Sequence, residues 1–193
     1  MRLAPDTLRG ARTGARQRVP RLVLLTDARN DAGLERALRR LPAGSALVYR
    51  HYHLAPVARA ARLRVLGRIA AMRGVVVVQA GVGYGPALQL SRRAGLRLAT
   101  AHNLREIGAA ARAGAHAVLL SPVFPTRSHP GASGLGALRF NCLARLSPLP
   151  VLALGGMDRR RLAQVRAHGF AAIDGLSNVA RPKMATRLKS VDS

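Results

Sequence analysis

Cysteine and acidic residues are scarce in this sequence and tryptophan is absent, and these shortages exclude several classes of protein and site. One cysteine, Cys142, stands among 193 residues, which excludes a disulfide framework and a cysteine-based zinc site within the chain. No apolar run reaches the roughly 18 residues that a membrane-spanning helix needs. Aromatic residues make up 3% and hydrophobic residues 49%, so we expect a single globular domain with a core of Leu, Val, Ala and Ile.

The shortage of acids leaves a formal net charge of +24, from 32 basic and 8 acidic residues. One interpretation is a polyanionic partner such as RNA, DNA or a phosphate-rich ligand. The other is a coding sequence rich in G and C, which explains the excess of arginine over lysine but not the lack of acids. No nucleic-acid-binding motif and no aromatic residues for stacking accompany the arginines, so a nucleic acid is the less favoured partner.

Residues 1–21 contain six arginines and one acid, Asp6, without the apolar centre of a secretory signal. We expect a cytoplasmic protein with no membrane partner, and an organellar transit peptide is the alternative. The expected organisation is a basic N-terminal extension (1–21), one domain (22–177) and a loose C-terminal tail (178–193).

Short apolar runs alternate with helical patterns along the chain. The runs begin near residues 22, 46, 75, 98, 118, 151 and 171. Helical patterns cover residues 31–41, 56–72, 103–113, 138–146 and 158–168, and the arginines of the 56–72 helix are expected to be mostly solvated. The alternation predicts a parallel sheet with crossover helices. An open doubly wound sheet and a closed eightfold barrel both satisfy it.

The placement of glycines favours the barrel. A dinucleotide-binding sheet needs a glycine fingerprint after its first strand, but Thr26–Asn30 stands there. Glycines follow the last two predicted strands instead, at Gly155–Gly156 and Gly175. A (β/α)8 barrel has its phosphate site after strands 7 and 8. We therefore expect an α/β fold of the (β/α)8 TIM-barrel class.

Candidate site residues follow the predicted strands, where a barrel carries its active site. Gly155 and Gly156 would let backbone N–H groups approach an anion, and a helix opening at Asp158 would add a positive dipole end. Ser177 would complete this phosphate cradle. A tight strand-to-helix turn explains the same glycines without a ligand.

The other strand ends carry further polar side chains. They are Arg50, His51, His53, Thr100, His102, Ser121, Thr126, Arg127, Ser128 and His129. The loop 121–131 can wrap an oxyanion, although a surface loop has the same composition. His102 can equally cap the helix that follows it.

The sequence shows no convincing metal site. Its six histidines are scattered, and no Asp or Glu pair stands at the strand ends. Asp27 and Asp174 are single candidates, each better explained as a turn or helix-capping residue. Cys142 falls within a predicted helix, where a small buried hydrophobic residue is expected.

Taken in order, these motifs resemble those of the thiamine phosphate synthase family and its thiazole tautomerase relatives. The matching segments are Leu25–Asp27, Val48–Arg50, Thr100–His102, Gly114–Thr126, Leu149–Met157 and Ile173–Ser177. The most specific part is Pro-Val-Phe-Pro-Thr at 122–126 followed by Ala-Leu-Gly-Gly at 153–156. The resemblance extends over residues 22–177.

The resemblance implies a (β/α)8 barrel and a transferase of thiamine biosynthesis. Such an enzyme joins hydroxymethylpyrimidine diphosphate to a thiazole phosphate, and diphosphate leaves with the help of Mg²⁺. By the resemblance, four residues hold the diphosphate: Arg50, Thr126, Ser128 and His129. The other implied substrate contacts are Thr100, His102, Ser121, Gly155, Gly156 and Ser177. A leaving diphosphate requires charge neutralisation and a phosphate requires backbone donors, which suits these roles.

Several positions depart from the family pattern. The family has an acid and a lysine where His51 and Tyr52 stand, and a lysine at the position of His129. Ser121 occupies the place of a family glycine, where some tautomerase relatives have a catalytic histidine. The family's Mg²⁺-binding acids have no counterpart in residues 79–93, which contain no acidic side chain. The missing ligands keep open a non-catalytic descendant that binds a phosphorylated ligand.

The same region is too short for a complete barrel. If Ala87–Leu90 is the fourth strand, residues 79–86 must make the crossover, whereas a parallel crossover takes a dozen residues or more. Three glycines and Pro86 also disfavour a helix there. We therefore expect a barrel that is degenerate around strands 3–4 and lacks its third helix.

Overall fold

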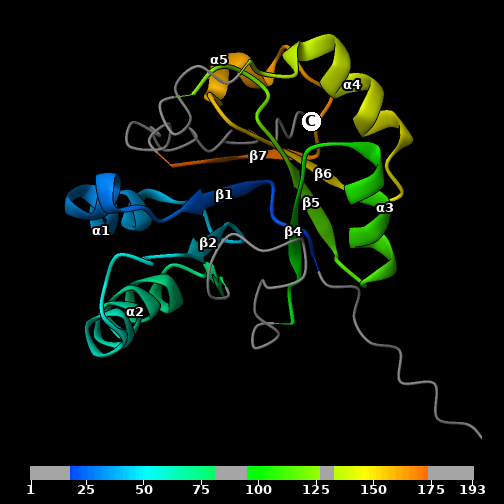
Figure 1. Ribbon diagram of the computed structural model, residues 1–193. Helices are drawn as coiled ribbons and strands as arrows, with labels where there is room; N and C mark the ends of the chain where they lie inside the picture. Colours follow the sequence, from blue (N-terminus) through cyan, green and yellow to red (C-terminus); the bar gives the residue numbers. More distant parts are fainter. Residues whose placement is uncertain (1–17, 81–94, 127–132, 174–193) are drawn as a thin grey trace, which may run out of the picture.

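The computed structural model describes residues 18–80, 95–126 and 133–173. These residues form seven parallel strands in one curled sheet with helices around its outside (Figure 1). The strands are β1 (Leu22–Leu25), β2 (Ala46–Tyr49), β3 (Val76–Gln79), β4 (Leu98–Ala101), β5 (Ala117–Leu120), β6 (Val151–Leu154) and β7 (Gly169–Ala172). The helices are α1 (Asp31–Arg40), α2 (Pro56–Met72), α3 (Leu104–Arg112), α4 (Gly136–Leu146) and α5 (Arg159–Leu162), with a 3₁₀ turn η1 (Ala28–Asn30).

The strand order follows that of a barrel. It runs β3-β2-β1-β7-β6-β5-β4, so the first strand pairs with the last and the described edges are β3 and β4. The α/β class and the TIM-like arrangement are thereby confirmed. The predicted fourth strand at Ala87–Leu90 and the missing third helix fall in residues 81–94, outside the described residues.

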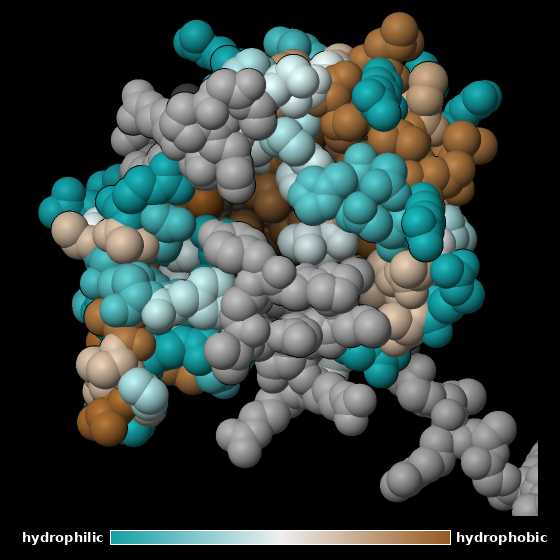
Figure 2. Space-filling model, in the orientation of Figure 1, coloured by the Kyte–Doolittle hydropathy of each residue, from teal (hydrophilic) through white to brown (hydrophobic). Residues whose placement is uncertain are grey.

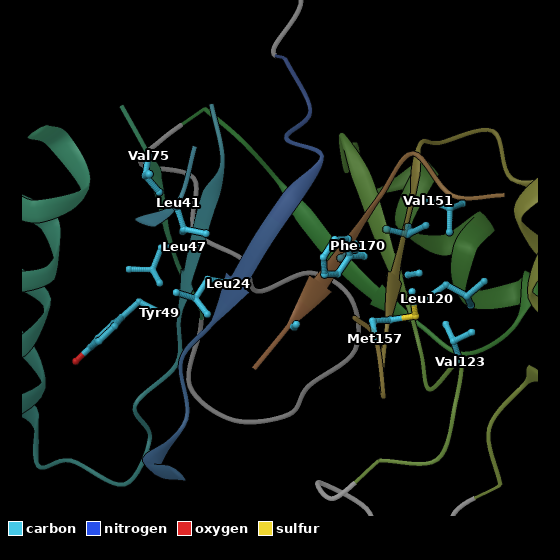
Figure 3. Packing of buried hydrophobic residues seen from close by; sticks show 14 of the residues in the cluster. Leu24, Leu41, Leu47, Tyr49, Val75, Leu120, Val123, Val151, Met157 and Phe170 are labelled. Atoms are coloured by element: carbon cyan, nitrogen blue, oxygen red, sulfur yellow. The ribbon is translucent and has the colours of Figure 1, made fainter. Parts of the chain in front are cut away.

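The two faces of the sheet have different partners. Alternate side chains of a strand point to opposite faces. On the outer face, Leu24, Leu47 and Phe170 pack in a cluster that contains buried residues of α1, α2, α3 and α4 (Figure 3). The inner face forms a second cluster from alternating residues such as Val23, Leu25, Val48, Leu119 and Leu152. Within the described ranges, no helix contributes to this inner cluster.

The helix predicted over 158–168 is wrong beyond its first turn. Asp158 caps α5 as expected, because its carboxylate accepts a hydrogen bond from the backbone N–H of Arg161 at 2.8 Å. The chain then tightens into three-residue turns up to Val165. Gly169 opens β7 instead of closing a helix, because the next residue, Phe170, donates its backbone N–H to the carbonyl of Arg21 at 2.9 Å. A Cβ on Gly169 would overlap that carbonyl oxygen.

One expectation about side-chain exposure is also wrong. Cys142 is exposed, because Phe140, two residues earlier on α4, takes the buried side of that helix. Of the α2 arginines, Arg64 and Arg68 are exposed as expected. Arg59 and Arg62 are partly buried and hydrogen-bonded.

Large apolar side chains are most exposed on two of the described helices. Val57 and Met72 on α2 are 83% and 71% exposed, and Leu138 and Leu146 on α4 are 82% and 58% exposed. Hydrophobic surface gathers over these two helices in Figure 2. Among the described residues, no helix is both long enough and apolar enough to span a membrane.

Candidate functional site

Most of the candidate residues come to one edge of the sheet. The strands are parallel, so their carboxyl ends share an edge. Arg50 directly follows β2, His102 follows β4, Ser121 follows β5 and Gly155 follows β6. Thr126 ends the described part of the loop after β5. Ser128, His129 and Ser177 lie outside the described residues.

Arg50 is held at this edge by its neighbours. Its backbone N–H donates to the Thr26 hydroxyl at 2.8 Å, and its Nε donates to the Thr26 carbonyl at 2.9 Å. Its Nη2 lies 3.2 Å from Oδ2 of Asp27, and its side chain is 15% exposed. The backbone carbonyl of Arg50 accepts from Nε of Arg59 at 3.1 Å. The Arg50 side chain is therefore an oriented cation at the carboxyl edge.

The residue after Arg50 has an unusual environment. His51 is 1% exposed and its backbone has a φ of 30°, in the left-handed region that non-glycine residues rarely adopt. Its Nδ1 lies 2.7 Å from the Thr26 hydroxyl, and its Nε2 lies 2.9 Å from a carboxylate oxygen of Asp31. The ring stacks on that of Tyr49, with centroids 4.8 Å apart.

These contacts fix the charge states of the group. Burial lowers the pKa of His51, although the carboxylate of Asp31 acts in the opposite direction. Burial would raise the pKa of Asp31, but hydrogen bonds from His51 and Arg62 outweigh it and hold that pKa below its usual value. A neutral His51 therefore faces an ionised Asp31.

Asp27 is a capping residue with two arginine partners. It caps η1 by accepting the backbone N–H of Arg29, and its carboxylate lies 2.9 Å from Nε of Arg29. Desolvation acts against its charge, but the hydrogen bonds from Arg29 and the charge of Arg50 lower its pKa. The turn-capping interpretation of Asp27 is confirmed, and Asp174 lies outside the described residues.

Gly155 and Gly156 are glycines because the chain after β5 packs directly on them. Both have a positive φ, of 93° and 61°. A Cβ on Gly155 would lie 2.8 Å from Cα of Pro122, and one on Gly156 would lie 2.7 Å from the carbonyl of Pro125. Phe124 donates its N–H to the carbonyl of Gly155 at 3.1 Å. The close approach brings the 122–126 motif against the glycine pair.

An arginine lies where the 122–126 motif packs against the glycine pair. The guanidinium of Arg161 lies 5.2 Å from the centroid of the Phe124 ring and donates to the carbonyl of Gly156. A cation thus stands beside the glycine pair, where the phosphate of a ligand is expected. Because α5 has only four residues, its dipole is weak. The Arg161 cation and the backbone N–H groups of the glycine pair are therefore better suited to bind an anion than the end of this helix.

Two candidate residues, Thr100 and His102, lie at the end of β4 in different environments. Thr100 lies on the inner face, since it alternates with the outward Ala99 and Ala101. The side chain of His102 is 59% exposed, and its Nδ1 lies 2.9 Å from the carboxylate of Glu106. The backbone N–H of His102 donates to the same carboxylate at 2.9 Å. His102 is therefore part of the N-terminal cap of α3, as the alternative interpretation expected.

The described residues do not provide a magnesium site. No group of three or more His, Cys, Asp or Glu side chains gathers anywhere in residues 18–80, 95–126 and 133–173. The carboxylate nearest Arg50 is that of Asp27, which is already bound to two guanidinium groups. A Mg²⁺ ion requires oxygen ligands that are free to coordinate it, so these donors do not fit the ion.

The contacts between α1, α2 and the ends of β1 and β2 could not be seen in the sequence. Asp31 and Glu35 are one helical turn apart on α1 and both bind Arg62 of α2, at 2.8 and 2.6 Å. The available signal was this spacing of two acids in a chain with few acids, together with Thr26, a polar residue that continues an apolar strand.

Comparisons with known proteins bear on the second half of the chain most directly. The family model for thiamine monophosphate synthase matches residues 91–179. Thiamine-phosphate synthase of Geobacillus thermodenitrificans is 33% identical over 92 residues, which are 45% of this chain and 41% of that protein. Thiamine-phosphate synthase of Prochlorococcus marinus is 29% identical over 87 residues, 44% of this chain and 25% of that protein. The matches thus span less than half the length of these relatives.

Solved structures extend the likeness to the whole fold. Thiamine phosphate pyrophosphorylase from Pyrococcus furiosus superposes with a TM-score of 0.64 at 19% identity, over 81% of this chain and 90% of that one. The native KDPGal structure gives a TM-score of 0.54 at 16% identity, over 79% and 82% of the two chains. The resemblance read in the motifs is confirmed: this chain is similar to the thiamine phosphate synthases in sequence over residues 91–179 and in fold over most of its length.

Proposed function

We propose that the chain is a thiamine phosphate synthase-like protein that binds a phosphorylated thiazole and a pyrimidine diphosphate and couples the two. The observation that carries the proposal is Arg50, an oriented cation at the carboxyl edge with a side chain 15% exposed. A guanidinium matches the geometry of phosphate oxygens, and one that is already oriented needs little reorganisation.

The proposed reaction is a substitution at carbon. The thiazole nitrogen forms a bond to the methylene carbon of the pyrimidine, while the bond from that carbon to diphosphate oxygen breaks and diphosphate departs with the electron pair. Arg50 would stabilise the charge that grows on the leaving group. Thr126, Ser128 and His129 are proposed as further diphosphate contacts.

The second proposed subsite lies around the glycine pair. Gly155 and Gly156, with Ser177, would bind the thiazole phosphate, and the guanidinium of Arg161 beside Phe124 supports an anion there. Thr100 would lie near the thiazole ring from the inner face of β4. Ser121 is proposed as a neighbouring substrate contact. The exposed side chain of His102 is proposed as another.

Magnesium enters no step of this proposal. Mg²⁺ assists diphosphate departure in the family, but the described donors do not fit it. We also propose that the barrel is degenerate around strands 3–4. The position of β3 and β4 as the two edges of the described sheet supports this.

A second candidate function is a non-catalytic protein that binds a phosphorylated ligand. It is favoured by one observation: the carboxylate closest to Arg50 serves as an arginine partner rather than a free metal ligand. A related possibility within the first proposal is action on a thiazole phosphate alone.

The two candidates separate in one experiment. Purified protein is incubated with hydroxymethylpyrimidine diphosphate, thiazole phosphate and Mg²⁺, and released diphosphate is measured for the wild type and for Arg50→Ala. Turnover that the substitution lowers by about a hundredfold supports the enzyme. Ligand binding without turnover supports the second candidate. If the protein shows no binding and no turnover, both candidates are rejected.

A further inference from the structure

A strained backbone stands next to the proposed anion-binding arginine. Among the described residues, His51 is the non-glycine residue with a positive φ, of 30°. Such a conformation costs free energy and persists where the surroundings enforce it. Since His51 directly follows Arg50, whatever enforces the turn at His51 also determines where the chain presents Arg50.

A directed chain of hydrogen bonds provides this enforcement. The ionised Asp31 can only accept, so Nε2 of His51 donates to it at 2.9 Å. In the neutral ring Nδ1 is then the acceptor and receives the Thr26 hydroxyl proton at 2.7 Å. The oxygen of that hydroxyl accepts the backbone N–H of Arg50 at 2.8 Å. Each group thus fixes the role of the next, from α1 to Arg50.

The central groups of this hydrogen-bond chain are inaccessible to water. Thr26 is 0% exposed and His51 is 1% exposed, so a broken bond there leaves a buried polar group without a partner. Tyr49 stacks on one side of the His51 ring and His53 approaches it at 5.0 Å between centroids. The ring therefore has one orientation, and both of its nitrogens are committed.

We propose that His51 is a positioning residue, which holds Arg50 in its anion-binding orientation through the chain Asp31–His51–Thr26. The proposal rests on the proposed function of Arg50 as a diphosphate ligand. A long side chain that is already fixed loses less conformational freedom when it binds an anion. Loss of the chain is therefore expected to weaken anion binding even though His51 itself does not touch the ligand.

The first test uses inorganic pyrophosphate as the probe, with binding measured by titration calorimetry on the full chain. In His51→Asn, asparagine tolerates the left-handed backbone but cannot span from Thr26 to Asp31. We expect its affinity for pyrophosphate to fall about tenfold relative to the wild type. The control is Arg64→Gln, at an exposed position of α2 outside this hydrogen-bond chain, which should bind within about twofold of the wild type.

A second pair of variants tests the same link from the other side. Thr26→Val keeps the shape of the side chain and removes the hydroxyl, whereas Thr26→Ser keeps the hydroxyl. We expect Thr26→Val to weaken pyrophosphate binding about tenfold and Thr26→Ser to restore it. A purely structural role predicts that affinity follows melting temperature in all of these variants. The positioning role predicts a loss of affinity in variants that remain folded by circular dichroism at the assay temperature.

The outcomes separate the two proposals. If Arg50→Ala binds pyrophosphate as the wild type does, the proposed function of Arg50 fails. If Arg50→Ala weakens binding but folded His51→Asn and Thr26→Val bind normally, the positioning role of His51 is overturned and the function of Arg50 stands. If His51→Asn does not fold, the comparison of Thr26→Val with Thr26→Ser decides the matter by the same readout.

Discussion

Arg62 of α2 binds Asp31 of α1 through two nitrogens, with Nε and Nη2 at 2.9 and 2.8 Å from the same carboxylate oxygen. Its third nitrogen, Nη1, binds Glu35 at 2.6 Å. The helices α1 and α2, which are neighbours in Figure 1, are thus joined by one guanidinium. Because Asp31 also receives Nε2 of His51, this ion pair connects the helix layer with the candidate site.

The Arg62 network is expected to contribute measurably to stability. Arg62→Ala leaves Asp31 and Glu35, which are partly exposed, without their shared partner, so we expect the free energy of unfolding to fall by about 1–2 kcal/mol. Arg64→Ala, at an exposed position of the same helix, is the matched control and should change it by less than about 0.5 kcal/mol. Urea denaturation of both variants checks this, and equal losses would contradict it.

Stability should fall as the pH decreases below the ordinary pKa of histidine. Burial lowers the pKa of His51, and the charges of His53 and Arg62 act in the same direction while Asp31 opposes them. Below about pH 6.5 the unfolded chain therefore binds a proton at His51 that the folded chain does not bind, which favours unfolding. At higher pH this group makes no pH-dependent contribution.

His51→Asn should remove that contribution. The melting temperature of the variant is expected to decline less steeply than that of the wild type between about pH 7 and pH 5. Asp27 and Asp31 have lowered pKa values, so their stabilising contribution disappears only as the pH falls below their ordinary value of 3.8. A parallel decline in variant and wild type over the upper range would refute the assignment of a buried neutral His51.

The glycine after β6 is expected to tolerate no side chain. Gly155→Ala combines a positive φ of 93° with a Cβ 2.8 Å from Cα of Pro122, so we expect a loss of about 2 kcal/mol or more in the free energy of unfolding. Gly67→Ala lies within α2 with nothing within 4 Å of the added Cβ. That control should gain about 0.5–1 kcal/mol. Thermal denaturation distinguishes the pair, and a neutral Gly155→Ala would show that the 122–126 segment does not pack as described.

Cys142 should react with thiol reagents in the folded protein. It is exposed on α4, between the exposed side chains of Leu138 and Leu146 on the same helix. We expect one thiol to be titrated by a dithiobis-nitrobenzoate reagent without denaturant, at a rate close to that of the denatured chain. A thiol that reacts only after denaturation would restore the interpretation of Cys142 as a core residue.

The alternation of buried strands and helices could be predicted because it is encoded locally. A strand covered on both faces is an apolar run, and β1, β2 and β4 lie where such runs were expected. A helix start with a capping side chain was equally readable, as Asp158 before α5 shows. The end of α5 could not be predicted from the sequence. The strand β7 starts where Gly169 contacts Arg21, and these two residues are far apart in the chain.

The site was predictable in position but not in its connections. Arg50 follows β2 at the expected edge, yet its partners Thr26 and Asp27 come from another strand. In the sequence, His51 is one more polar side chain at a strand end, whereas in the structure burial lowers its pKa against the opposing effect of Asp31, to which it is hydrogen-bonded. Such pairings depend on the register of β1 against β2, which no local pattern specifies.

The central claim is that the carboxyl edge binds phosphorylated thiazole and pyrimidine ligands, and the most direct test is the melting temperature with each ligand present. Thiazole phosphate and hydroxymethylpyrimidine diphosphate are added separately at about 1 mM, a concentration at which a ligand of 10 μM dissociation constant stabilises by about 2.7 kcal/mol. We predict that both raise the melting temperature of the wild type, and that Arg50→Ala loses the response to the diphosphate while it keeps the response to thiazole phosphate. No shift with either ligand would contradict the account.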